Sequence, residues 1–296
     1  MTAIKFIISG SFLVLNTLVC GLAIHYYIVL QFLSRLFGKS SSALKKFQDR
    51  IRARMVIISE RWITWNSWAF KKFLRFRPRT QIPEGLAEKD SYIVVSNHRS
   101  WTDILVLQMV FNHRIPFLRF FIKDTLKWVP VLGPVWKALD YPFMKRKGGA
   151  SGNARDLETA RMSCETLKGK PVSVLIFLEG TRFTFDKWRK QKSPFKNLLK
   201  PKIGGLGITI DSLGSQIKSI VDVTIVYPKR KLPFGLTSFL SGKVSDVRVQ
   251  IKEIPIPEIF RNGHLSDDRR LRQQFEVWIN QIWAEKDEFI ASHQMS

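Results

Sequence analysis

The segment VVSNHRSWTDILVL, residues 94–107, places His98 five positions before Asp103. A carboxylate bonded to one imidazole nitrogen fixes the tautomer and leaves the other nitrogen as a general base. Five residues of a continuous helix turn through about 500°, so the two side chains can meet only if His98 lies in a loop before the helix. Ser100 and Asp103 have the spacing of a capping box, which would begin that helix. The segment therefore predicts a catalytic pair or, alternatively, a buried imidazole beside a helix cap.

The segment FLEGTRFTFDK, residues 177–187, combines an apolar, strand-like run with polar groups. A glycine such as Gly180 lets the backbone approach a ligand closely. Arg182 could hold a phosphate with its guanidinium fork, and Glu179 could accept hydrogen bonds from a polyol. The alternative is an ordinary turn with a solvent-facing arginine.

Eight basic side chains and one acidic side chain, Asp186, lie between residues 182 and 202. Gly204 and Gly205 follow at a possible helix start, where free backbone N–H groups would favour an anion. A phosphate site and a solvated basic loop are both compatible with this pattern.

Several common catalytic motifs are missing from the sequence. There is no G-x-S-x-G nucleophile elbow, no G-x-x-x-x-G-K-[ST] phosphate loop and no G-x-G-x-x-G turn. These absences lower the support for a serine hydrolase, a P-loop NTPase and a dinucleotide-dependent dehydrogenase. There is also no C-x-x-C or H-E-x-x-H pattern, and Cys20 and Cys164 do not make a disulfide framework. We therefore expect no metal site.

The chain carries 48 Lys and Arg against 24 Asp and Glu, a net charge of +24. Such a charge favours an anionic partner, either nucleic acid or a membrane surface. Residues 1–80 hold 14 of the basic and 2 of the acidic side chains, a net of +12 and thus half of the excess. Because this charge lies beside the most apolar part of the chain, we expect a membrane and not nucleic acid.

The 29 residues between Lys5 and Arg35 contain no Asp, Glu, Lys or Arg. A helix of this length exceeds the roughly 30 Å of a hydrocarbon core, so residues 1–40 are predicted to be a transmembrane anchor. A cleaved signal peptide and a buried soluble helix are the alternatives. Basic residues are concentrated after the span, which places the rest of the chain on the cytoplasmic face, in bacteria at the inner membrane.

Residues 41–80 are predicted to form a basic amphipathic helix in which tryptophan and phenylalanine alternate with lysine and arginine. This mixture suits the lipid headgroup zone. A helix packed on the domain with a solvated basic face is the alternative. A second short span would be interrupted by Glu60 and Arg61.

Residues 81–296 are predicted to form an α/β domain with a mixed, mostly parallel sheet flanked by helices. The strand candidates are nearly continuous in apolar residues, as expected for a sheet covered on both faces. They are residues 92–96, 141–144, 172–179, 220–227 and 244–251. Helices are predicted at 153–168, at 204–213 and after the candidate cap Ser266.

Together these segments resemble the membrane-bound glycerophospholipid acyltransferase family, which includes the 1-acyl-glycerol-3-phosphate acyltransferases. Its NHxxxxD motif matches Asn97, His98 and Asp103, and its FPEGTR motif matches residues 177–182. YPFMKR, residues 141–146, is similar to a third motif that ends in arginine, and the resemblance covers about residues 80–235. Two departures, Leu178 in place of the usual proline and Tyr227 in place of the valine of a Val-Pro element, affect the expected substrate preference and not the chemistry.

The resemblance implies transfer of a fatty acyl group from acyl-CoA or acyl carrier protein to a lysophospholipid hydroxyl. The expected acceptor is 1-acyl-glycerol-3-phosphate, which would give phosphatidic acid. His98 would be the general base and Asp103 its orienting partner. The implied substrate-binding residues are Glu179, Gly180, Thr181 and Arg182, with Arg146 and Lys202 as further phosphate ligands. No bound cofactor is expected, because a thioester is already activated.

Two other functions stay open at this point. The net charge would suit a cationic membrane-associated regulator that binds nucleic acid or protein, although no RNA-binding signature is visible. A non-catalytic relative of the family is the other possibility. The intact His98, Asp103, Glu179 and Arg182 argue against it.

Overall fold

The computed structural model describes residues 2–37, 41–144, 150–228, 235–244 and 246–293. The long helices are α1 (Thr2–Phe37), α2 (Ser42–Ala69) and α10 (Arg269–His293). The short helices are α3 (Thr102–Phe111), α4 (Leu132–Ala138), α5 (Ala150–Glu165), α6 (Phe185–Gln191), α7 (Gly204–Leu213), α8 (Leu236–Leu240) and α9 (Glu258–Arg261). A π-helical turn, η1 (Phe70–Leu74), follows α2, and a 3-10 turn, η2 (Asp124–Trp128), precedes α4.

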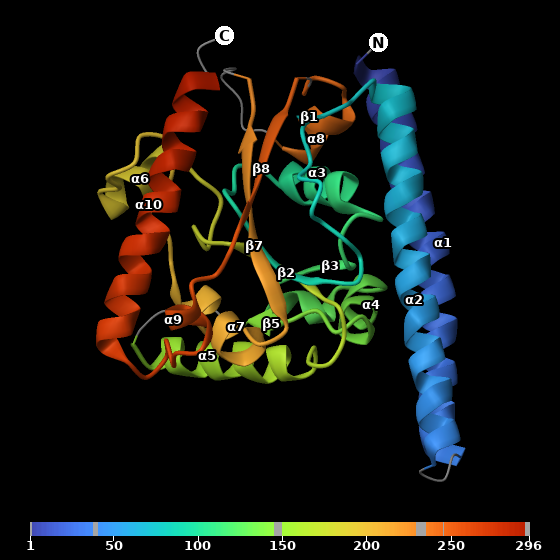
Figure 1. Cartoon of the computed structure of the whole chain (residues 1–296). Coiled ribbons are helices and arrows are strands. Elements are labelled where there is room, and N and C mark those ends of the chain that lie inside the picture. The colour runs from blue at the N-terminus through green and yellow to red at the C-terminus, as the bar shows by residue number, and fades with distance from the viewer. Residues whose placement is uncertain (1, 38–40, 145–149, 229–234, 245, 294–296) are drawn as a thin grey trace.

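The strands are β1 (Arg79–Thr80), β2 (Ser91–Ser96), β3 (Leu118–Phe120), β4 (Ile122–Lys123), β5 (Phe143–Met144), β6 (Ser173–Phe177), β7 (Ile217–Val226) and β8 (Arg248–Ile254). Six of them form one sheet in the order β1-β8-β7-β2-β6-β3. β2 pairs in parallel with both β6 and β7, whereas β7 and β8 are antiparallel. The predicted fold class, a mixed and mostly parallel sheet flanked by helices, is confirmed (Figure 1).

Side-chain alternation along the central strands divides the core into two layers. Ile93 and Val95 of β2 point to the cluster that includes α5, α7 and α10. Tyr92 and Val94 point to the opposite cluster, which includes α3, η1 and α8. All six residues of β2 are buried, which explains its continuous apolar sequence.

Several predicted elements differ from the structure. The helix predicted over residues 41–80 ends at Ala69, and Arg79 and Thr80 form β1 of the main sheet. Residues 141–144 contribute only β5, which pairs with β4 in a separate two-stranded sheet and not with the main sheet. The last helix begins at Arg269 and not directly after Ser266. The reason is local, since Asp268 accepts a hydrogen bond from the backbone of Leu271, while Ser266 is bonded to Asp211.

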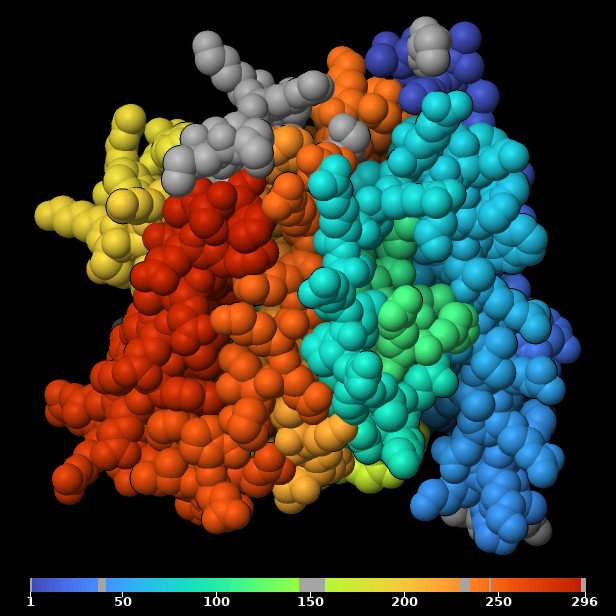
Figure 2. Space-filling model, turned by 45° about the horizontal axis from the view of Figure 1, so that its top comes forward, coloured from blue at the N-terminus to red at the C-terminus, as the bar shows by residue number. Residues whose placement is uncertain are grey.

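Helices α1 and α2 run antiparallel beside one another as a hairpin at one edge of the molecule (Figure 1). Polar side chains connect them, because Asn16 donates to Asn66 at 2.9 Å and Trp62 donates to Thr17 at 3.0 Å. The other side of α1 packs on η1, α4 and α8. Figure 2 shows the hairpin on one flank of the molecule and α10 on the opposite flank.

One helix, Thr2–Leu36, is long and apolar enough to cross a membrane, by length and composition, among the residues that the structure describes. A helix along the membrane normal and a helix in the membrane plane would cross at a steep angle, whereas α1 and α2 lie side by side (Figure 1). The transmembrane and interfacial assignments of these two segments therefore stay predictions.

Candidate active site

Three neighbouring strands end at the same edge of the sheet. Because β7, β2 and β6 are parallel, the residues that follow them meet there. His98 follows β2, Glu179 follows β6, and Tyr227 follows β7. The sequence motifs are thus brought together by strand order and not by proximity along the chain.

His98 and Asp103 form a hydrogen-bonded pair. The Nδ1 atom of His98 lies 2.8 Å from Oδ2 of Asp103. His98 lies in the loop before α3 and Asp103 in the first turn of that helix, as the sequence predicts. Asp103 is fully buried, whereas the His98 side chain is 16% exposed. The ring therefore reaches the surface of a cavity while its carboxylate partner stays away from water.

The helix start has part of the predicted capping box. The Asp103 carboxylate accepts from the backbone N–H of Ser100 at 2.8 Å and from that of Arg99 at 2.6 Å. The Ser100 hydroxyl accepts from the backbone N–H of Thr102 at 3.1 Å, and the backbone N–H of Asp103 donates to the Ser100 carbonyl at 3.2 Å. The carboxylate half of the box holds the loop from His98 to Asp103 in a tight turn.

The His98 ring is fixed by a second contact. It stacks on Phe177 at the end of β6, with 4.0 Å between ring centroids and 16° between planes. The His98 backbone carbonyl also accepts from the backbone N–H of Phe183 at 2.8 Å. Stacking and backbone bonding restrict the imidazole to one orientation toward the cavity.

Asn97 attaches the loop to the neighbouring strand. Its side-chain oxygen accepts from the Ile225 backbone N–H at 2.8 Å, and its side-chain nitrogen donates to the Ile225 carbonyl at 2.9 Å. The amide thus continues the pairing between β2 and β7 by one step. This explains physically why an asparagine precedes the histidine.

Glu179 is fully buried next to the backbone of His98. Its two carboxylate oxygens accept from the backbone N–H groups of His98, at 2.8 Å, and Leu199, at 3.0 Å. Burial raises the pKa of Glu179 to about 7, although these two bonds and the nearby Arg99 lower it in part. In this geometry Glu179 joins two loops, and its predicted contact with substrate stays a prediction.

The other residues of the EGTR segment reach the cavity. Gly180, Thr181 and Arg182 all line it together with His98. Gly180 has a φ of +66°, and a Cβ added there would lie 3.2 Å from the side chain of Lys202. Glycine therefore suits both the backbone conformation and the space at this position.

Arg182 and Thr181 have partners within the site. The Arg182 guanidinium lies over the Trp101 ring, 5.4 Å from its centroid. The Thr181 hydroxyl accepts from the Lys187 ammonium at 2.7 Å. Arg182 is thus a positive group at a mostly apolar cavity, which Lys123 also lines.

The remaining predicted phosphate ligands are placed differently. Lys202 passes beside Gly180 but is not among the described residues that line the cavity. Arg146 lies outside the described residues. Gly204 begins α7, as predicted, and opens into a separate pocket beside Arg161 and Arg272.

The cavity above His98 has a volume of about 820 Å³, within the range of small-molecule sites. The sheet domain, which follows the hairpin, supplies most of its apolar wall from α3, β3, β4, η2 and α4. The hairpin supplies the rest, which the sequence did not predict, with Leu13, Thr17, Cys20, Gly21, Ile24, Ser59, Trp62 and Ile63. An elongated apolar ligand could therefore lie between the hairpin and the sheet domain with one end at His98.

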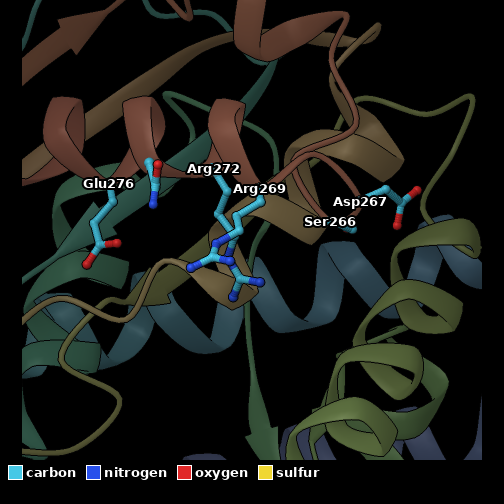
Figure 3. Close-up of a pocket in the computed structure, with 6 residues that line it drawn as sticks. Ser266, Asp267, Arg269, Arg272 and Glu276 are labelled. Carbon is cyan, nitrogen blue, oxygen red and sulfur yellow. The ribbon is translucent and has the colours of Figure 1, made fainter.

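A separate polar pocket of about 430 Å³ lies at the start of α10 (Figure 3). Arg269 and Arg272 extend into it, and Asp267 and Glu276 also line it. It contains no residue of the two motifs and no histidine. The residues of the two motifs that line a cavity lie instead around His98.

Known proteins with similar sequences are acyltransferases. A family model described as Acyltransferase matches residues 77–227. The chain is 26% identical over 212 residues to mouse 1-acyl-sn-glycerol-3-phosphate acyltransferase epsilon, covering 64% of this chain and 56% of that protein. It is 27% identical over 252 residues to the human delta form, covering 81% of this chain and 60% of that protein.

The name of a yeast relative specifies a lysophosphatidylinositol as acceptor, in place of 1-acyl-sn-glycerol-3-phosphate. It is 2-acyl-1-lysophosphatidylinositol acyltransferase from Saccharomyces cerevisiae, 26% identical over 252 residues, with 67% of this chain and 60% of that protein covered. The chain thus spans less than two thirds of the length of these relatives.

A solved structure has the same fold along nearly the whole chain. The crystal structure of the 1-acyl-sn-glycerophosphate acyltransferase PlsC from Thermotoga maritima superposes with a TM-score of 0.55 at 16% identity. It covers 98% of both chains, and at this identity the likeness concerns the fold. The family model covers just over half of the 296 residues, and the names of the relatives specify glycerophospholipid acceptors. The chain therefore belongs to the glycerophospholipid acyltransferase family.

Proposed function

We propose that this protein transfers a fatty acyl group from a thioester, acyl-CoA or acyl carrier protein, to the free hydroxyl of a lysophospholipid. The observation that carries the proposal is the His98–Asp103 pair at the end of an apolar cavity with Arg182 at its rim. The names of the relatives support 1-acyl-glycerol-3-phosphate as the acceptor. The product would then be phosphatidic acid.

The geometry supports a general-base mechanism. Nδ1 of His98 is bonded to Asp103, which leaves Nε2 to take the proton of the substrate hydroxyl. The hydroxyl oxygen attacks the thioester carbonyl and forms a tetrahedral intermediate. As the intermediate collapses, the carbon–sulfur bond breaks and the protonated imidazole returns the proton to the thiolate. Ester and free thiol are the products, and His98 ends neutral.

The two ends of the cavity suit the two ends of a lysophospholipid. Arg182 can bind a phosphate through two parallel hydrogen bonds, which a lysine could not do. The long apolar wall can bind an acyl chain, since apolar surface leaves water there. Charge at one end and apolar surface at the other would orient the acceptor hydroxyl toward His98.

The hairpin supports attachment to a membrane. Most of its exposed side is apolar, with exposed residues that include Ile7, Val14, Leu18 and Leu22 on α1 and Trp65 on α2. An exposed apolar surface of this extent is typical of a membrane or protein contact. Because the same hairpin lines the cavity, attachment would bring the site next to its lipid substrate.

The proposal is tested with purified protein in detergent or in vesicles. Radiolabelled acyl-CoA and acyl carrier protein are each offered with lysophosphatidic acid, lysophosphatidylinositol and other lysophospholipids. We expect transfer to at least one acceptor and a loss of about 10²–10⁴-fold in His98→Ala. Equal rates in the wild type and the folded His98→Ala variant would contradict the assigned base.

A further inference from the structure

The Asp103 carboxylate has one hydrogen-bond partner that the motif does not include. Its Oδ2 atom accepts from His98, Arg99 and Ser100. Its Oδ1 atom accepts from the Tyr227 hydroxyl at 2.6 Å. Asp103 is fully buried and Tyr227 is 4% exposed, so this phenol takes the place that water would have at an exposed carboxylate.

The backbone around Tyr227 is held against the catalytic loop. Tyr227 directly follows β7, and Ile225, two residues earlier, is bonded twice to the Asn97 side chain. The loop and the end of β7 are therefore connected through Asn97 on one side of His98 and through Asp103 on the other. A tyrosine in this register has little freedom to leave Asp103.

We propose that Tyr227 is a positioning residue of this active site, whose hydroxyl holds the Asp103 carboxylate in place and neutralises part of its charge. The proposal rests on the acyl transfer proposed above. Without the hydroxyl, Oδ1 would be buried and unsatisfied. The unshared negative charge would then favour protonated His98, which cannot accept the proton of the substrate.

The phenol is suited to this role because it remains a donor. Burial raises the pKa of Tyr227 well above its ordinary value, and the adjacent Asp103 raises it further. The hydroxyl therefore stays protonated throughout the pH range in which a histidine works as a base. A phenylalanine would fill nearly the same space without the bond.

Other ionisable groups also face the pair. They are Arg99 from the same loop, Glu179 after β6, and Arg182 and Lys123 at the cavity. Glu179 matters most here, because its pKa of about 7 lies in the range of a histidine. A test must therefore separate the effect of Tyr227 from that of Glu179.

The main test compares Tyr227→Phe with the wild type between about pH 5 and about pH 9. We expect kcat to fall about tenfold and the acid limb of the pH profile to move upward by about half a unit. KM should be unchanged, because Tyr227 is not among the described residues that line the cavity. The shift should persist in a Glu179→Gln background and vanish in an Asp103→Asn background.

Tyr92→Phe is the matched control. Tyr92 is also buried, and its hydroxyl donates to a carboxylate, that of Asp90, at 3.2 Å. It lies at the opposite end of β2 from His98. The control should retain the wild-type pH profile, so a similar shift in both variants would overturn the proposal.

A third variant avoids any change in packing. Replacing Tyr227 with 3-fluorotyrosine makes the phenol a stronger donor and should move the acid limb downward. The Nδ1 proton of His98, followed by NMR in the substrate-free protein, should move downfield in Tyr227→Phe. The NMR result does not depend on turnover, so it tests Tyr227 even if the proposed acyl transfer were wrong. The role of Tyr227 would be overturned if the pH profile were unchanged in both Tyr227→Phe and the 3-fluorotyrosine variant. An unchanged Nδ1 resonance in Tyr227→Phe would overturn it as well.

Discussion

At the scale of residues, Glu179 has a structural role that the sequence did not indicate. Its role as a ligand for the glycerol phosphate stays a prediction, and both of its carboxylate oxygens accept from backbone N–H groups of two loops. A buried carboxylate needs such donors, because burial without them costs several kcal/mol. The motif glutamate thus positions the backbone of His98. A strand-end acidic residue in an apolar run was the signal that could have indicated this.

We predict that Glu179 makes the stability of the protein depend on pH. Its pKa is raised to about 7 by burial, against an ordinary value of 4.5, so between these values the folded chain binds more protons than the unfolded chain. The free energy of unfolding should therefore fall as the pH rises through this window, by on the order of 3 kcal/mol. Denaturant unfolding at several pH values measures the effect.

Glu179→Gln should lose this part of the pH dependence, because the amide does not ionise. Glu285→Gln is the matched control, since that carboxylate is 64% exposed and should keep the wild-type dependence. A steep fall in stability between pH 4.5 and 7 that persists in Glu179→Gln would assign it to other groups.

At the scale of elements, continuous apolar runs predicted β2, β6, β7 and α7, because each is buried on both sides. The motifs predicted His98 and Asp103, which are close in sequence. The bond between Asp103 and Tyr227 could not be predicted from the sequence. The two residues are 124 positions apart, and only the order of the strands in the sheet brings them together. For the same reason, the contribution of α1 to the cavity could not be predicted from its composition.

One turn of α10 is hydrogen-bonded to the loop 195–199, which lies beside the site. Trp283 donates to the Leu199 carbonyl at 3.0 Å, and the Asp287 carboxylate accepts from the backbones of Lys196 and Asn197 at 2.7 Å each. The loop 195–199 in turn holds Glu179 through Leu199. The last helix is therefore connected to His98 through the loop 195–199 and through Glu179.

We predict that Asp287→Ala lowers kcat several-fold and stability by about 1–2 kcal/mol, because two charge-assisted bonds are lost. KM should change little, since Asp287 is not among the described residues that line the cavity. Steady-state kinetics and thermal unfolding measure both effects. Glu288→Ala, its exposed neighbour on α10, should behave like the wild type, and equal effects would mean that α10 acts through general destabilisation.

At the scale of the whole molecule, the sheet domain and the hairpin share one cavity and pack along a long contact. The contact on α1 extends from Lys5, beside Gly242, to Ile24, which is buried in a further apolar cluster formed with α2 and α4. This length of helix measures about 30 Å, the thickness of a hydrocarbon core. If α1 stood along the membrane normal, the sheet domain would lie at the same depth as the lipid chains.

If the hairpin binds a membrane, as proposed above, this geometry favours a hairpin that lies along one face of the membrane with its exposed apolar side toward the lipid chains. From Ile24 to Phe37 the helix extends only about 20 Å farther, which is too short to span a bilayer. The basic side chains of α2 could then reach lipid phosphates while its tryptophans lie in the headgroup zone. This arrangement would place the cavity next to lipid without carrying charged groups through the membrane.

We predict that both ends of α1 are accessible from the side of the membrane that carries the sheet domain. Single cysteines at Thr2, at the start of α1, and at Ser42, just after its end, are labelled with an impermeant maleimide in sealed vesicles, in a chain with Cys20 and Cys164 replaced by alanine. Lys190→Cys on α6, which is exposed, marks the side of the sheet domain. A hairpin on one face gives labelling of all three positions from one side, whereas a transmembrane α1 places Thr2 and Ser42 on opposite sides. In the second case the sheet domain would have to separate from α1, and the cavity wall formed by Thr17 and Gly21 would not exist in the membrane-bound protein.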